Sequence, residues 1–218
     1  MKDKYFTEDN IKTESLKMMV QLSNSHGSKL KMRITKDIAL IVTDMQNYFL
    51  DENSHAFVPS AQAIIPGIKS LINSCRNKNI PVIFTKHTNN EANAGAMSRW
   101  WRDLMHENSN QCEIYSEFNT DSCLIIEKHQ YDAFYQTELK TYLVQNNIKQ
   151  VIVTGVLTHL CCETTARSAF VNGYDVFFPI NGTATYKKNY HRSSLLNLSH
   201  GFAVPCLIED LITQIESL

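Results

Sequence analysis

The chain has 218 residues, of which 43% are hydrophobic and 20% charged, and its formal net charge is −1. This length suits one large domain, or one domain with an arm, and the charge excludes a broad basic surface for nucleic acid or an anionic membrane. No apolar run approaches the roughly 20 residues of a membrane-spanning helix. The six cysteines include no C-x-x-C pair, so we expect a reduced, cytoplasmic protein. The N-terminus, MKDKYFTEDNIKTES, has no apolar h-region, so we expect no signal peptide.

The first 36 residues are polar and rich in lysine, and the stretch SNSHGSK (Ser23–Lys29) is typical of a linker. Helical spacing predicts a short amphipathic helix that covers the body of the protein or a neighbouring subunit. The residues on its apolar face are Ile11, Ser15, Met18, Met19 and Leu22. A frayed terminus is the alternative. We therefore expect an N-terminal arm at 1–36 and one domain at 37–218.

From Asp37 onward, apolar runs of strand length alternate with longer helical patterns. The predicted strands are 38–45, 81–87, 123–129, 150–156, 175–180 and 203–210. The predicted helices are 60–78, 94–107, 133–147, 160–172, 190–200 and 209–217. Almost continuous Ile, Val and Phe indicates strands covered on both faces. The pattern predicts an α/β fold of three αβα layers, with a six-stranded, mostly parallel, doubly wound sheet of Rossmann type.

Chemically useful side chains stand where three of these strands end. Asp44 ends the first strand, Lys128 ends the third, and Cys161 follows the fourth. Ligands of doubly wound folds bind beyond the carboxyl ends of the strands. A carboxylate, an amine and a thiol should therefore meet at one rim of the sheet.

Two adjacent cysteines open the helix after the fourth strand. Cys162 shares a small apolar stripe with Ala166 and Ala169, which predicts packing against the sheet. Cys161 lies on a more polar line in the first turn, where the helix dipole favours a thiolate and a lowered pKa. This interpretation makes Cys161 the nucleophile. Two buried structural thiols are the alternative, and a vicinal disulfide is a third interpretation.

Asp44 and Lys128 are predicted to act together. Asp44 would take the thiol proton, and partial burial would raise its pKa toward a useful value. A buried lysine is costly unless it is paired, and Asp44 is the natural partner of Lys128. The alternatives are a turn aspartate and a surface lysine whose stem alone is buried.

No other catalytic or cofactor pattern stands out in the sequence. His87, His129 and His159 are interpreted as pocket walls or hydrogen-bonded structural residues rather than as general bases. The chain has neither a clustered metal-ligand pattern such as H-x-H nor a nucleotide-binding loop. We therefore expect no cofactor.

Three blocks then carry a family resemblance. They are IVTDMQNYFL at 41–50, IIEKHQYDAFYQTEL at 125–139, and VTGVLTHLCCETTARSAFVNGYDVFFPINGTAT at 153–185. From about residue 37 to its end the chain resembles the isochorismatase-like cysteine hydrolases, a superfamily of nicotinamidases, N-carbamoylsarcosine amidohydrolase and isochorismatases. The resemblance implies a catalytic set of Asp44, Lys128 and Cys161. It also implies a cis peptide bond at Val156–Leu157, an oxyanion hole formed by the backbone N–H groups of Leu157 and Cys161, and a homodimer or homotetramer.

The substrate pocket is expected around the same rim. The predicted pocket residues are Asn47, Phe49, His87, Trp100, Trp101, Tyr131, Phe134, Thr158 and His159. The segment Ser98–Glu107 looks like an insertion over the rim, so its two tryptophans form either a lid or a subunit interface.

The expected function is a metal-independent cysteine hydrolase that cleaves a C–N bond of a small amide or carbamoyl compound through a thioester. Residues 51–60 lack the D-x-H…H metal set of nicotinamidases. The alternative is an isochorismatase, which cleaves a vinyl ether and does not need the cysteine, with Arg99 and Arg102 as candidate carboxylate ligands. A non-catalytic binding protein and a thiol redox sensor are further alternatives.

Overall fold

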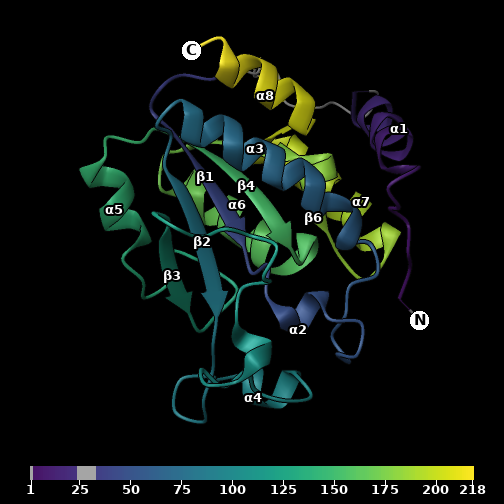
Figure 1. Ribbon diagram of the computed structural model, residues 1–218, viewed down its shortest axis with the longest axis vertical. Coiled ribbons are helices and arrows are strands. Elements are labelled where there is room, and N and C mark those ends of the chain that lie inside the picture. The colour runs from purple at the N-terminus through teal and green to yellow at the C-terminus, as the bar shows by residue number, and fades with distance from the viewer. Residues whose placement is uncertain (1, 24–32) are drawn as a thin grey trace.

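The computed structural model describes residues 2–23 and 33–218, which form a seven-stranded sheet between helical layers (Figure 1). The strand order is β3-β2-β1-β4-β5-β7, with the short β6 paired to β4, and every strand pair is parallel. The strands are β1 (Ile38–Thr43), β2 (Val82–His87), β3 (Leu124–Lys128), β4 (Gln150–Val156), β5 (Asp175–Pro179), β6 (Thr183–Ala184) and β7 (Val204–Cys206). The predicted fold class is confirmed, with β6 as one strand more than predicted.

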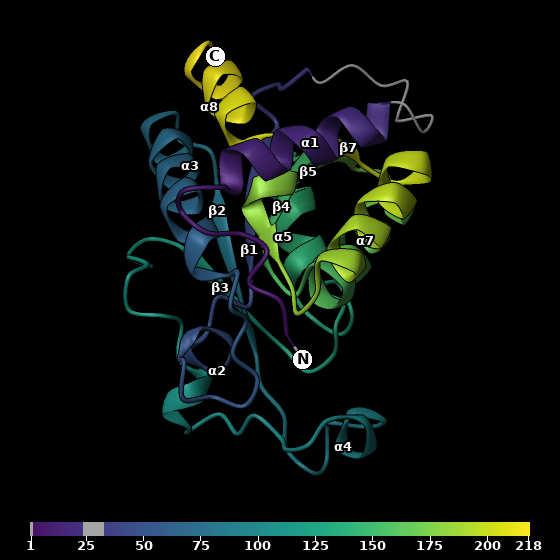
Figure 2. The same ribbon diagram turned by 90° about the vertical axis from the view of Figure 1, so that its right-hand side faces the viewer.

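Helices cover both faces of the sheet. Figure 2 shows α3 and α8 on one side, and α5 and α7 on the other. The helices are α1 (Ile11–Ser23), α2 (Asn47–Leu50), α3 (Ile65–Asn77), α4 (Met97–Trp100), α5 (Leu139–Gln145), α6 (Glu163–Val171), α7 (Lys188–Gly201) and α8 (Ile208–Glu216). None of the helices within the described ranges is long and apolar enough to cross a membrane.

The position of each strand in the sheet explains its sequence. Every residue of β1 and β4 is buried, because these central strands have helices on both faces. β3 lies at one edge, and its residues alternate in exposure, with Ile125 40% exposed. The strand order reverses between β1 and β4, which is where a ligand site is expected in such a sheet.

Three predicted elements differ from the structure. The helix predicted at 94–107 is wrong except for the single turn of α4, because Trp101 and Met105 turn inward to line a pocket. The helix predicted from residue 133 begins only at Leu139, after a left-handed residue at Gln136. The strand predicted at 203–210 ends at Cys206, and α8 follows at once.

The N-terminal residues pack on the body of the protein. α1 buries Ser15, Met18 and Leu22, and the segment before it buries Tyr5 and Phe6. The predicted linker lies, apart from Ser23, outside the described residues. The division of the chain into an arm and a domain remains a prediction.

Candidate active site

Asp44 follows β1 in a left-handed backbone conformation, with φ of +49°. Its amide N–H donates to the backbone oxygen and to Oγ1 of Thr85, at 3.3 and 3.1 Å. The Thr85 hydroxyl in turn donates to Asp44 Oδ1 at 2.5 Å. These bonds fix the carboxylate between the ends of β1 and β2.

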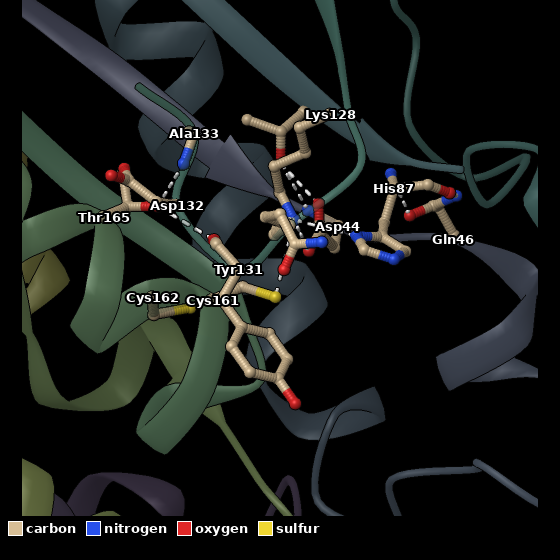
Figure 3. Close-up of polar contacts among 12 residues, drawn as sticks. Asp44, Gln46, His87, Lys128, Tyr131, Asp132, Ala133, Cys161, Cys162 and Thr165 are labelled. Carbon is tan, nitrogen blue, oxygen red and sulfur yellow. Dashed lines mark hydrogen bonds and ion pairs between the residues drawn. The ribbon is translucent and has the colours of Figure 1, made fainter. Parts of the chain in front are cut away.

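Lys128, the last residue of β3, brings its ammonium to the same point (Figure 3). Its Nζ lies 2.7 Å from Asp44 Oδ2, 3.5 Å from Cys161 Sγ and 3.0 Å from the backbone oxygen of Gln130. Burial acts to lower the pKa of Lys128, but the adjacent Asp44 and Cys161 raise it above the usual value. The lysine is therefore charged, and the interpretation as a surface lysine is wrong because its side chain is fully buried.

Burial and Asp44 both keep the Cys161 thiol protonated. Cys161 lies in a π-helical turn, Thr158–Cys162, directly before α6. Burial raises the pKa of its thiol, the negative charge of Asp44 raises it further, and Lys128 acts in the opposite direction. The expected lowering of this pKa is wrong, because the loss of water and the neighbouring carboxylate outweigh any favourable helix dipole.

The pKa of Asp44 also shifts in the direction opposite to the prediction. Burial acts to raise it, but the charge of Lys128 and a hydrogen bond with Cys161 hold it below its usual range. His87 stays neutral in this site, because burial and Lys128 lower its pKa to about 4. The resting state is thus an ionised carboxylate beside a neutral thiol, with a permanent cation touching both.

The two adjacent cysteines have different surroundings. Figure 3 shows Cys161 directed toward Asp44 and Lys128, and Cys162 directed away from them. Cys162 is fully buried, and its Sγ lies 3.8 Å from the backbone oxygen of Thr154. Both cysteines are free thiols, so the vicinal disulfide is wrong, and Cys162 packs in the core as predicted.

The Val156–Leu157 peptide bond directly before the cysteine turn is cis. Leu157 and Cys161 both line the same pocket. The other lining residues are Tyr48, Phe49, His87, Asn89, Met97, Trp101, Asp103, Met105, Tyr131 and Leu160. The pocket is mainly apolar and aromatic, which suits a small planar substrate.

Several predicted pocket residues lie in this wall and others do not. Phe49, His87, Trp101 and Tyr131 line the pocket, and Trp101 Nε1 donates to the Tyr131 hydroxyl at 3.0 Å. The two tryptophans have separate environments, because Trp100 is 83% exposed and lies outside the lining.

The remaining predicted pocket residues are used elsewhere. The Asn47 side chain donates to the backbone oxygen of Asn110 at 2.8 Å, and the Phe134 ring packs against Tyr174. Thr158 and His159 form hydrogen bonds behind the cysteine turn rather than facing the pocket. Arg99 and Arg102 also lie outside the pocket lining.

A carboxylate at the pocket wall was not predicted from the sequence. Asp103 accepts a hydrogen bond from the Tyr48 hydroxyl at 2.6 Å and lies 2.8 Å from His55 Nε2. Burial acts to raise the pKa of Asp103, but the bonds from Tyr48 and His55 hold it below its usual value. The local sequence does not distinguish Asp103 as a pocket residue, because its partners Tyr48 and His55 lie about 50 residues away.

The metal set of nicotinamidases has no counterpart here. His55 is engaged with Asp103, and Asp51 accepts a hydrogen bond from the Asn53 amide. Across residues 2–23 and 33–218, no three His, Cys, Asp or Glu side chains are grouped closely enough to hold a metal ion. The residues present do not fit such a metal, and no step of the chemistry below uses one.

The model of the isochorismatase domain matches residues 38–210. The chain belongs to the isochorismatase family. Isochorismatase-family relatives include nicotinamidase 3 of Arabidopsis thaliana, which is 37% identical over 174 residues, 78% of this chain and 84% of the relative. The isochorismatase of Bacillus subtilis is 26% identical over 181 residues, but this chain covers only 58% of its length.

A solved structure has the same fold. The cysteine hydrolase from Pseudomonas syringae superposes with a TM-score of 0.83, at 24% identity, over 86% of this chain and 97% of the other. At this identity the likeness establishes the fold alone. The family resemblance predicted from the three sequence blocks is confirmed, and with it the general class of hydrolase.

Proposed function

We propose that this protein hydrolyses a C–N bond of a small, uncharged amide or carbamoyl compound, with Cys161 as the nucleophile. The observation that carries the proposal is the contact of one ammonium with both an ionised carboxylate and a thiol. Lys128 Nζ lies 2.7 Å from Asp44 and 3.5 Å from Cys161. Such a set can pass one proton from the thiol to the carboxylate and later to a leaving group.

The reaction follows from the protonation states at rest. Asp44 takes the Cys161 proton as the sulfur attacks the amide carbon. The nearby Lys128 ammonium lowers the free-energy cost of negative charge on the sulfur. The carbonyl oxygen becomes an oxyanion, which the backbone N–H groups of Leu157 and Cys161 would hold. Asp44 then gives the proton to the departing nitrogen, the C–N bond breaks, and a thioester remains. Water hydrolyses the thioester, releasing the acid and restoring the thiol.

The charge of the pocket favours an uncharged substrate. Asp103 is the charged side chain in the pocket lining, and that lining includes no lysine or arginine. A substrate with carboxylates would face this negative charge without a cation to bind it. The name of the Arabidopsis relative, nicotinamidase, also supports an amide substrate.

An isochorismatase remains the second candidate function, supported by the name of the Bacillus relative. The lack of a cationic side chain in the pocket lining counts against it. The reaction itself distinguishes the two, because vinyl ether cleavage does not need a nucleophilic thiol.

The proposal is tested by ammonia release from a panel of small amides, ureas and carbamoyl acids. We expect turnover by the wild type and by Cys162→Ala, and none by Cys161→Ala. Full activity of Cys161→Ala on an amide would disprove the thioester route. Hydrolysis of isochorismate by both the wild type and Cys161→Ala would establish the second candidate instead. A cytoplasmic homodimer or homotetramer remains part of the proposal.

A further inference from the structure

The segment before α1 reaches the back of the candidate active site. Figure 2 shows it running along the side of the sheet toward the start of α7. The N–H groups of Tyr5 and Phe6 donate to Ser60 Oγ at 2.9 and 3.1 Å. The Asp3 N–H donates to the backbone oxygen of Tyr186 at 2.7 Å. Tyr5 is 7% exposed, so its side chain is held inside the protein.

The Tyr5 hydroxyl joins two elements that flank the cysteine turn. Its oxygen accepts the backbone N–H of Thr185 at 3.0 Å and lies 3.1 Å from Nδ1 of His191 on α7. Burial lowers the pKa of His191 to about 3, so the ring is neutral. Nδ1 of a neutral imidazole has either one hydrogen or one lone pair, so the hydroxyls of Tyr5 and Thr158 share this single position on His191.

Through His191, Tyr5 is coupled to the turn that carries the nucleophile, because a shift of one hydroxyl changes the hydrogen bond available to the other. The same Nδ1 lies 3.0 Å from Oγ1 of Thr158, a fully buried residue in the π-helical turn with Cys161. Thr185 also bonds this turn directly, because its Oγ1 lies 2.6 Å from His159 Nδ1. Neither Tyr5 nor His191 lines the pocket, so neither can touch a substrate there.

We propose that Tyr5 is a positioning residue for Cys161, acting through His191 and Thr158; this inference rests on the proposed function of Cys161. The position of the turn determines how Sγ lies relative to Lys128 Nζ, at 3.5 Å. Displacement of a reacting group by about 1 Å can cost about 100-fold in rate, so a remote hydrogen bond can govern catalysis. Tyr5 lies outside the family match at 38–210, so this part of the site comes from the chain's own N-terminal segment.

The test compares Tyr5→Phe with variants of Thr158. We expect Tyr5→Phe to lower kcat about tenfold while KM changes less than about twofold, because the pocket wall is untouched. Thr158→Val should behave alike, and Thr158→Ser, which keeps the hydroxyl, should retain most of kcat. The double variant Tyr5→Phe/Thr158→Val should be no slower than the slower single variant, since both changes break one chain of contacts.

A second measurement keeps the test independent of the substrate. The rate at which iodoacetamide alkylates Cys161, followed by mass spectrometry, should change at least threefold in Tyr5→Phe. Ile215→Val, a buried change on α8, is the control for a general loss of stability and should leave both kcat and the alkylation rate unchanged at a similar melting temperature. Tyr5→Phe values within twofold of the wild type in both assays would overturn the inference, and so would equal losses in Ile215→Val. Activity of Cys161→Ala would overturn the proposed function instead, and the alkylation rates would still decide the role of Tyr5.

Discussion

The carboxylate of Asp44 and the ammonium of Lys128 lie 2.7 Å apart, and both side chains are fully buried. Each ion has lost its water and is stabilised mainly by the other, with Thr85 and the Gln130 backbone supplying further hydrogen bonds. The pair therefore behaves as one unit in folding and, under the proposed mechanism, in catalysis. Removal of either partner leaves a buried charge without compensation.

Lys128→Met should destabilise the protein by about 3–5 kcal/mol, because it leaves Asp44 charged in a site without water. Urea unfolding followed by circular dichroism measures the free energy of unfolding. The matched control is Lys69→Met, which breaks an exposed pair with Glu117 and should cost about 1 kcal/mol or less. Similar losses in the two variants would contradict the structural role given to the buried pair.

Catalysis should require the ionised form of Asp44. The pKa of this carboxyl is held below its usual value of about 3.9, so kcat/KM should stay level from about pH 5 to pH 8 and fall only in more acidic solution. Asp44→Asn, which lacks the base, should lower kcat by about 100-fold to 10,000-fold. The measurement is a pH–rate profile on the best amide of the panel. A loss of activity centred between pH 6 and 7 would point to a different base.

Asp103→Asn should relax the discrimination against negatively charged substrates. Two unit charges about 4 Å apart near a protein surface repel by about 4 kcal/mol, so loss of this charge should raise kcat/KM for an amide that bears a carboxylate by about tenfold or more. The value for a neutral amide should change little. His55→Gln is the control that keeps the carboxylate and should keep the discrimination. An equal change for both substrates would show that Asp103 acts only on pocket shape.

Glu14 links α1 to the start of α7 through an ion pair with Lys188, and it also pairs with Lys17. Hydrogen bonds from Lys17 and Lys188 lower the pKa of Glu14 to about 2. Its unfolded pKa is about 4.3, so its stabilisation is complete above that pH and is lost as the pH falls toward 2. Glu14→Gln should cost about 1 kcal/mol or less at pH 7 and almost nothing near pH 2 in urea titrations. A free-energy cost of Glu14→Gln that increases as the pH falls would contradict this prediction.

Gly155→Ala should prevent stable folding. Gly155 in β4 has φ of +103°, and an added Cβ would lie 2.1 Å from the backbone oxygen of Thr43 in β1. Gly173→Ala is the matched control, because φ there is +90° but nothing lies within 4 Å of the added atom. The control should cost about 1–2 kcal/mol, the strain of a left-handed alanine. Soluble yield and melting temperature compare the two, and equal values would mean that backbone strain alone matters.

The strands and the site residues Asp44, Lys128 and Cys161 could be predicted because a short stretch of sequence is enough to indicate each of them. Buried parallel strands are continuous apolar runs, and Asp44, Lys128 and the cysteine turn follow three of them. The separation of Cys161 from Cys162 also came from local helical spacing. These signals do not depend on knowing which distant residues meet.

The failures concern contacts between distant parts of the chain. The pKa directions of Asp44 and Cys161 depend on complete burial and on their mutual distance, which no single stretch contains. The helix expected at 94–107 was lost because inward-turning Trp101 and Met105 outweigh local propensity. Tyr5 meets Thr185 and His191 across about 180 residues, so its role has no signature in the sequence.

Lys128 stands on β3, an outermost strand of the sheet, with one face partly open to solvent. Local unfolding of β3 alone would move the Lys128 ammonium away from Asp44 and Cys161 while β1 and β4 remain paired. Under the proposed mechanism, turnover would then be lost at a temperature below that of global unfolding.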